Sequence, residues 1–207
     1  TQSLLAFSRK QILNIEPVNV NGIIEDITTL LSRIMGEHID VSTELSTSPL
    51  CVLADKGQLE QVLMNLAPNS RDVMPEGGSF VISTEMIELD DSYAEFGEYV
   101  QSGKYVAISV TDTGCGMDEE TRQKIFEPFF TTKDAGRGTG LGLAIVYGII
   151  KQHKGLIEVI SSRARGTTFR LLLPMVDERA EIRESAARAR MAEGGSETIL
   201  LAEDNDA

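Results

Sequence analysis

Apolar residues recur along this chain with two different periods, and the helical period of three to four residues marks three segments. The first predicted helix runs from Val20 to Met35 and ends at Gly36. A second is predicted from Asp55 to Met74, because Asp55 and Gln58 form a polar pair that resembles a capping box. The third is predicted from Gly140 to His153.

Between these helices, segments that alternate or are rich in β-branched residues predict strands. They are Ile39 to Leu45, Leu50 to Leu53, Ser79 to Glu88, Lys104 to Thr111, Leu156 to Ser161 and Thr167 to Leu172. Asp90 to Gly103 is expected to be a hairpin connection on the surface. Together these elements predict an α/β sandwich, in which a mixed sheet of about five main strands carries the three helices on one face.

The two ends of the chain differ from this central part. Residues 1–14 are interpreted as the end of a helix, which Glu16-Pro17 is expected to terminate. Residues 15–176 are predicted to form the main domain. Residues 177–196 are a charged run, interpreted as a solvated linker helix, and residues 197–207 are predicted to begin a further domain.

Composition limits the partners of the chain. A net charge of −13 argues against binding to nucleic acid or to an anionic membrane, because both are held by clustered Lys and Arg. No apolar run approaches the ~20 residues that cross a bilayer, so no membrane contact is expected here, although a parent protein could have one elsewhere. Cys51 and Cys115 lack metal-ligand spacing and are expected to be buried or partly buried thiols of a reducing, cytoplasmic compartment.

A glycine-rich segment, residues 136–142, leads directly into the third predicted helix. Such a loop allows close approach of a ligand, and the helix N-terminus behind it offers free N–H donors to a phosphate. A plain turn is the alternative. The segment lacks the Gly-Lys-Ser/Thr of a P-loop and has no strand directly before it, unlike a dinucleotide-binding loop. The nearest cations, Lys133 and Arg137, are candidate phosphate contacts or solvated residues.

Other polar residues are candidates for binding a base and a metal ion next to the phosphate. Asn65 and Asn69 are four residues apart and therefore share one helix face. Asp112 ends a predicted strand, and Gly114 and Gly116 permit a sharp turn after it. The Asp112 carboxylate can accept a hydrogen bond from the exocyclic amine of adenine, and the amide oxygen of Asn69 suits Mg²⁺.

Five motifs in this order resemble those of one family. They are Asn65 to Asn69, Asp112 to Gly116, Phe126 to Phe130, Gly138 to Gly142 and Gly166 to Phe169. Over about residues 15 to 174 the chain resembles the ATP-binding catalytic domain of sensor histidine kinases, in the superfamily that includes gyrase, heat-shock chaperone and mismatch-repair ATPases. The resemblance implies a two-layer α/β sandwich of the GHKL (Bergerat) type with a mobile ATP lid.

The resemblance also implies roles for particular residues. Asn69 is then the Mg²⁺ ligand, Asp112 recognises adenine, and Phe126 to Gly138 is the lid. Nucleotide contacts are expected from Asn69, Asp112, Gly114, Gly116, Lys133, Arg137, Gly138, Thr139, Gly140, Leu141, Gly142 and Thr167. Asn65 is interpreted as a residue of the second Mg²⁺ shell or as a catalytic helper in transfer. Arg71 and Asp72 are either part of the site or a structural ion pair.

The flanks resemble those of hybrid kinases. Residues 1–14 look like the end of a dimerisation helix, and Ile199 to Asp204 looks like the first strand of a receiver domain. The function implied is transfer of the ATP γ-phosphate to a histidine on a separate dimerisation domain, within a homodimeric parent protein. One rival is a related ATP hydrolase, which would have a glutamate in place of Asn65. The other is a regulatory nucleotide-binding module without transfer activity.

Three residues qualify this interpretation. Pro68 lies inside the second predicted helix, where it is expected either to be tolerated or to shift Asn69 relative to Asp112. His38 and His153 are each followed by a non-acidic residue, unlike the family's acceptor histidine, and are expected to lie at the surface or at a helix C-terminus. The chain alone is therefore expected not to phosphorylate itself.

Overall fold

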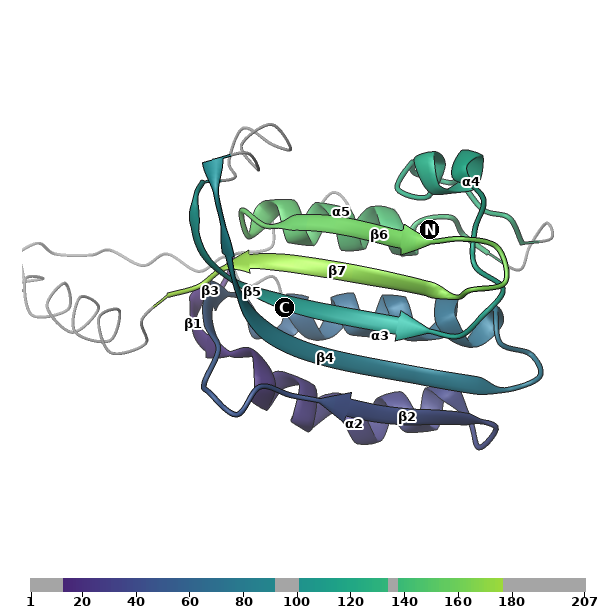
Figure 1. Cartoon of the computed structure of the whole chain (residues 1–207), viewed down its shortest axis with the longest axis horizontal. Coiled ribbons are helices and arrows are strands. Elements are labelled where there is room, and N and C mark those ends of the chain that lie inside the picture. Colours follow the sequence, from purple (N-terminus) through teal and green to yellow (C-terminus); the bar gives the residue numbers. More distant parts are fainter. Residues whose placement is uncertain (1–12, 92–100, 134–137, 177–207) are drawn as a thin grey trace, which may run out of the picture.

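Three helices cover one face of a five-stranded sheet in the computed structural model, which describes residues 13–91, 101–133 and 138–176 (Figure 1). The strand order is β2 (Ile39–Glu44), β4 (Gly78–Leu89), β5 (Gly103–Asp112), β7 (Thr167–Pro174) and β6 (Leu156–Ser161). β2 and β4 are parallel and the other pairs are antiparallel. The helices are α2 (Val20–Met35), α3 (Lys56–Asp72) and α5 (Gly142–Gln152). The predicted two-layer sandwich is therefore confirmed.

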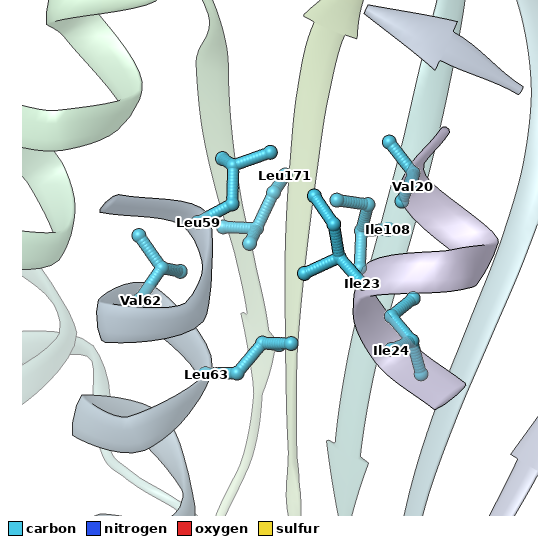
Figure 2. Close-up of a pocket in the computed structure, with 8 residues that line it drawn as sticks. All are labelled: Val20, Ile23, Ile24, Leu59, Val62, Leu63, Ile108 and Leu171. Carbon is cyan, nitrogen blue, oxygen red and sulfur yellow. The ribbon is translucent and has the colours of Figure 1, made fainter. Parts of the chain in front are cut away.

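The core lies between the helices and the sheet because each element presents one apolar face. In α2 the buried side chains recur at helical spacing, and in β4 and β5 every second residue points toward the helices. A small apolar cavity remains between α2, α3 and the sheet (Figure 2). Its lining consists of Val20, Ile23, Ile24, Leu59, Val62, Leu63, Ile108 and Leu171.

Two elements differ from the sequence prediction. Pro17, which was expected to terminate a helix, lies in β1 (Glu16–Asn19), which pairs with β3 (Cys51–Ala54) as a separate antiparallel sheet. Proline is tolerated there because both strands of a two-stranded sheet are edge strands. The short helix α4 (Glu119–Lys124) was not predicted, since none of its residues is buried and it therefore leaves no apolar periodicity.

Pro68 does not interrupt α3, which runs as one helix from Lys56 to Asp72. Its neighbours Leu66 and Ala67 are both fully buried in the core, and this packing holds the helix in place despite the lost backbone hydrogen bond. Beyond the proline, the Asn69 side-chain amide donates to the carbonyl of Asn65, one turn earlier, at 3.0 Å. The proline is therefore tolerated, which is one of the two outcomes expected for it.

His153 was expected at the surface or at a helix C-terminus. The structure places it at the C-terminus of α5 but buries it, so the surface alternative is wrong. It follows the last turn of α5 but is only 6 % exposed. Its Nε2 accepts a hydrogen bond from the backbone N–H of Asp55 at 3.0 Å, and its Nδ1 faces the carbonyl of Ile149 at 2.8 Å. These partners require a neutral ring with the proton on Nδ1, which links α5 to the start of α3. His38 is exposed, as expected.

The two cysteines differ in their exposure to solvent. Cys51 is buried, but Cys115 is exposed, so the prediction of two buried or partly buried thiols is wrong for Cys115.

None of the helices in the described ranges has the length and apolar character that a membrane span needs. β4 and β5 are antiparallel neighbours, as expected for a hairpin. The predictions for residues 1–12, 92–100, 134–137 and 177–207 lie outside the described part of the chain.

Candidate functional site

Asp112 lies at the end of β5 and is only 3 % exposed. Its Oδ1 accepts a hydrogen bond from the Gly114 N–H at 2.9 Å, and its Oδ2 accepts one from the Ser70 hydroxyl at 3.0 Å. Burial raises the pKa of the Asp112 carboxyl, although the hydrogen bonds from Gly114, Ser70 and the Thr167 backbone partly offset this effect. The carboxylate is thus fixed in position at the edge of the site.

The loop after Asp112 is held against the turn between β6 and β7. Cys115 accepts a hydrogen bond from the Ala164 N–H at 2.7 Å through its carbonyl oxygen. Gly116 adopts φ +66°, and a Cβ atom there would lie 2.0 Å from the carbonyl oxygen of Ser162. Only glycine allows this approach. The packing of these two loops therefore requires glycine at position 116, whereas a Cβ atom at Gly114 would lie 2.5 Å from Val73 Cγ2 at the end of α3.

On the other side of the site, α3 presents Asn65 and Asn69 toward the start of α5. A Cβ atom added at Gly142 would lie 3.7 Å from Asn69 Nδ2 and 3.8 Å from Asn65 Oδ1. Among the described residues, no side chain caps α5 at Leu141, so the first N–H groups of this helix are available to an anion. The buried Asn65 Nδ2 has no hydrogen-bond partner among the described residues. Two amides and a helix N-terminus thus face one small region.

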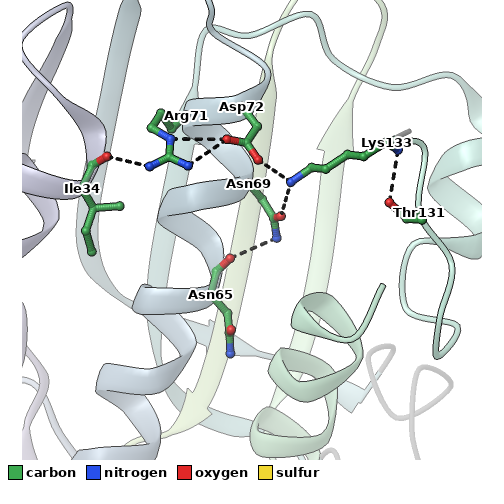
Figure 3. A network of polar contacts seen from close by, with 7 residues as sticks. All are labelled: Ile34, Asn65, Asn69, Arg71, Asp72, Thr131 and Lys133. Carbon is green, nitrogen blue, oxygen red and sulfur yellow. Dashed lines mark hydrogen bonds and ion pairs between the residues drawn. The ribbon is translucent and has the colours of Figure 1, made fainter. Parts of the chain in front are cut away.

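A network of charges adjoins this region (Figure 3). Lys133 Nζ lies 2.5 Å from Asp72 Oδ2 and 3.4 Å from Asn69 Oδ1. Arg71 donates to Asp72 Oδ1 at 3.0 Å and to the Ile34 carbonyl at 3.2 Å. Burial would raise the pKa of Asp72, but the hydrogen bonds and charges of Lys133 and Arg71 outweigh it, so the pKa is lowered. Asp72 is therefore an anion held between two cations.

The segments on either side of residues 134–137 are tied to each other. The Phe129 N–H donates to the Gly140 carbonyl at 2.9 Å. Gly140 has φ +64°, and a Cβ atom there would lie 2.3 Å from the carbonyl carbon of Phe129. Phe129 itself has φ +70° and is 64 % exposed, whereas Phe126 packs against Tyr147 of α5 with 5.3 Å between ring centroids. The aromatic cluster is thus anchored to α5 through Phe126.

Residues 54–177 match the family model for histidine kinase-, DNA gyrase B-, and HSP90-like ATPases. The chain belongs to this family. Domains of the family bind ATP, and the residues around Asp112 and at the start of α5 lie within the matched range. The described domain is therefore an ATP-binding catalytic domain of the histidine kinase type.

Among curated proteins, the chain is 43 % identical to sensor kinase CckA of Brucella abortus over 213 residues, covering the whole chain and 22 % of that relative. It is 35 % identical to the signal transduction histidine-protein kinase AtoS of Escherichia coli over 175 residues, covering 84 % of the chain and 26 % of the relative. The chain thus spans about a quarter or less of the length of these relatives.

Among solved structures, the catalytic domain of histidine kinase ThkA is 33 % identical, with a TM-score of 0.61. The match covers 78 % of the chain and 95 % of that domain. A structure of ThkA in complex with the response regulator protein TrrA is 29 % identical, with a TM-score of 0.64, and covers 84 % of the chain and 46 % of ThkA.

The site residues predicted for this ATPase domain fall into two groups in the structure. Asn65, Asn69 and Gly142 lie together, and Asp112 lies at the end of the central strand β5, where its carboxylate accepts a hydrogen bond from Ser70 of α3. Thr139 accepts a hydrogen bond from the Leu141 N–H at 3.4 Å, and the buried Thr167 hydroxyl contacts Ser161 at 3.0 Å. Gly138 lies beside Lys133 and Thr131. Arg137 lies outside the described residues.

Sequence reasoning missed the residues that support the loop after Asp112. Ser161 accepts a hydrogen bond from the Met117 N–H at 2.9 Å. Asp118 accepts one from the Thr121 N–H at 2.8 Å and forms an ion pair with Arg163 at 2.6 Å. The bonds to Thr121, followed by those to Arg163, hold the Asp118 pKa well below its usual range. An Asp three residues before Thr121 was the available signal of a helix cap.

Proposed function

We propose that this chain is the catalytic part of a hybrid sensor histidine kinase, which transfers the γ-phosphate of Mg²⁺-ATP to a histidine on a separate dimerisation domain. The observation that carries the proposal is the N-terminus of α5, which no side chain of the described residues caps and which Asn65 and Asn69 flank. Free N–H groups and a helix dipole favour the phosphates there. We further propose a receiver domain in the same homodimeric, cytoplasmic parent protein.

Each part of the site has a separate task in this proposal. Asp112 accepts a hydrogen bond from the exocyclic amine of adenine and so orients the base. The start of α5 holds the phosphate chain. Mg²⁺ fits beside Asn69, because the amide oxygen is a hard donor. The Lys133 ammonium lies 3.4 Å from this oxygen, so the position already accommodates a positive charge. When bound, Mg²⁺ would neutralise charge on the phosphate oxygens.

In the chemical step, this domain forms no covalent bond to the phosphoryl group. A neutral imidazole nitrogen of the acceptor histidine forms a bond to the γ-phosphorus while the bond from that phosphorus to the bridging oxygen breaks, and ADP leaves. The protein contributes alignment and charge neutralisation. Asn65 cannot take a proton from water near neutral pH, unlike a glutamate at that position, which favours transfer over hydrolysis.

Calorimetry with ADP and Mg²⁺, followed by labelled ATP, tests the proposal. We expect the chain alone to bind ADP, to remain unlabelled and to release little phosphate. Addition of the matching dimerisation domain in trans should produce label on that domain, since separating the domains lowers only their effective concentration. Stable label on His38 or His153, or rapid phosphate release that survives Asn65→Ala, would contradict transfer and favour the hydrolase.

A further inference from the structure

One ammonium group lies between two oxygen atoms of α3 (Figure 3). Lys133 Nζ is 2.5 Å from Asp72 Oδ2 and 3.4 Å from Asn69 Oδ1. Asn69 and Asp72 are three residues apart, so they lie on the same face of the last turn of the helix. The two oxygen atoms therefore border a single cation position, to which a segment 61 residues away along the chain contributes the cation.

The oxygens around this position are suited to a metal ion. A carboxylate and an amide oxygen are both hard donors of the type that Mg²⁺ prefers. Arg71 binds the other carboxylate oxygen, Oδ1, and so leaves Oδ2 directed at Lys133. The side chains of Asp72 and Lys133 are 33 % and 32 % exposed, so solvent and a ligand can reach the pair.

Building on the function proposed above, we propose that Asp72 binds the nucleotide's Mg²⁺ together with Asn69, and that Mg²⁺ replaces the Lys133 ammonium at this position. Mg²⁺ has twice the charge of the ammonium, and the phosphates that arrive with it attract the displaced lysine. Without Mg²⁺, the Asp72 carboxylate repels the phosphates. Asp72 thus makes tight nucleotide binding depend on the metal.

A purely structural ion pair predicts something different. Exposed ion pairs typically contribute about 0–1 kcal/mol to stability, and losing one would alter nucleotide binding equally with and without metal. A metal-binding carboxylate instead has opposite effects under the two conditions. Its loss weakens binding of the metal complex and removes repulsion of the bare nucleotide.

The test compares ADP affinity in excess Mg²⁺ and in EDTA for the wild type and Asp72→Asn. We expect Asp72→Asn to bind ADP at least tenfold more weakly in Mg²⁺ and at least as tightly as the wild type in EDTA. Glu60→Gln is the matched control, because it removes one carboxylate and its ion pair with Lys56 from the same helix, about 18 Å away along the axis. It should preserve the wild-type ratio of the two affinities.

A second measurement uses Mn²⁺ alone, followed by electron paramagnetic resonance. Lys133→Met should bind Mn²⁺ more tightly than the wild type because the competing ammonium is gone, and the added Asp72→Asn substitution should abolish this gain. This result does not depend on nucleotide binding.

Several outcomes would overturn the inference. They are an unchanged ratio of affinities in Asp72→Asn, an equal loss in both media, or Mn²⁺ binding by Lys133→Met that survives Asp72→Asn. Failure of the proposed function looks different, because the wild type would then either bind no ADP in Mg²⁺ or hydrolyse ATP rapidly without labelling the dimerisation domain.

Discussion

The Asp112 carboxylate combines burial with three hydrogen-bond donors from the protein, which leaves it acceptor capacity for a ligand. Ser70, Gly114 and the Thr167 backbone all donate to it, so both oxygens are held in fixed directions. The Ser70 hydroxyl donates from α3, one residue after Asn69. A carboxylate held in this way can distinguish a base that offers a donor from one that offers an acceptor.

Asp112→Asn tests this recognition at the level of one residue. The amide can keep its oxygen toward Gly114 and its NH₂ toward the Ser70 oxygen, so the fold should remain. The charged acceptor for adenine is lost, which should cost about 1.5–3 kcal/mol, or roughly ten- to a hundredfold in ADP affinity. Calorimetric titration measures the loss, and unchanged affinity would place adenine elsewhere.

The same substitution predicts a pH dependence of stability. Burial raises the folded-state pKa of Asp112 above its unfolded value, so the stability that this group contributes is present at low pH and is lost as pH rises through the folded pKa. The Asp112→Asn variant does not lose stability in this way, because its amide does not ionise. Its melting temperature relative to the wild type should therefore increase as the pH rises toward neutral from below 3.8, the ordinary pKa of an Asp carboxyl, and a difference that decreases with pH would contradict the assignment.

Among the elements, the predictable ones are those with a one-sided apolar face. α2, α3, α5 and the main strands follow from periodicity, with shifts of a few residues at their ends. β1 was missed because Pro17 in a short edge strand resembles a helix stop, and α4 was missed because charge pairs and the Asp118 cap define it instead of buried residues. Short elements fixed by capping or by a distant partner leave little periodic signal.

His153 is a testable link between two helices. Its ring satisfies the Asp55 N–H at the start of α3 and the Ile149 carbonyl in α5. His153→Ala leaves both groups buried without this partner and opens a cavity, which should lower the free energy of unfolding by about 1–3 kcal/mol. Urea denaturation measures the change. His38→Ala, at an exposed histidine, should stay within about 0.5 kcal/mol of the wild type.

At the scale of the whole molecule, the site depends on contacts between distant segments. The sequence motifs identified Asn69 and Asp112 as candidate residues, but the Ser70–Asp112 and Lys133–Asp72 contacts join residues 42 and 61 positions apart. These pairs arise when α3 packs against the sheet and Lys133 lies against the last turn of α3. Residue type and local spacing do not indicate which distant segments pack together, so these two contacts could not be predicted from the sequence.

Because the site joins α3, the β5 loop and α5, nucleotide binding should stabilise the entire domain. At a ligand concentration one hundred times Kd, binding adds about 2.7 kcal/mol to the free energy of unfolding. For a domain of this size, that corresponds to a rise in melting temperature of about 5–10 °C. Thermal denaturation with ADP and Mg²⁺ measures it, and the same ADP concentration with Asp112→Asn is the control. An equal rise in Asp112→Asn would mean that the stabilising nucleotide lies outside the site between α3 and β5.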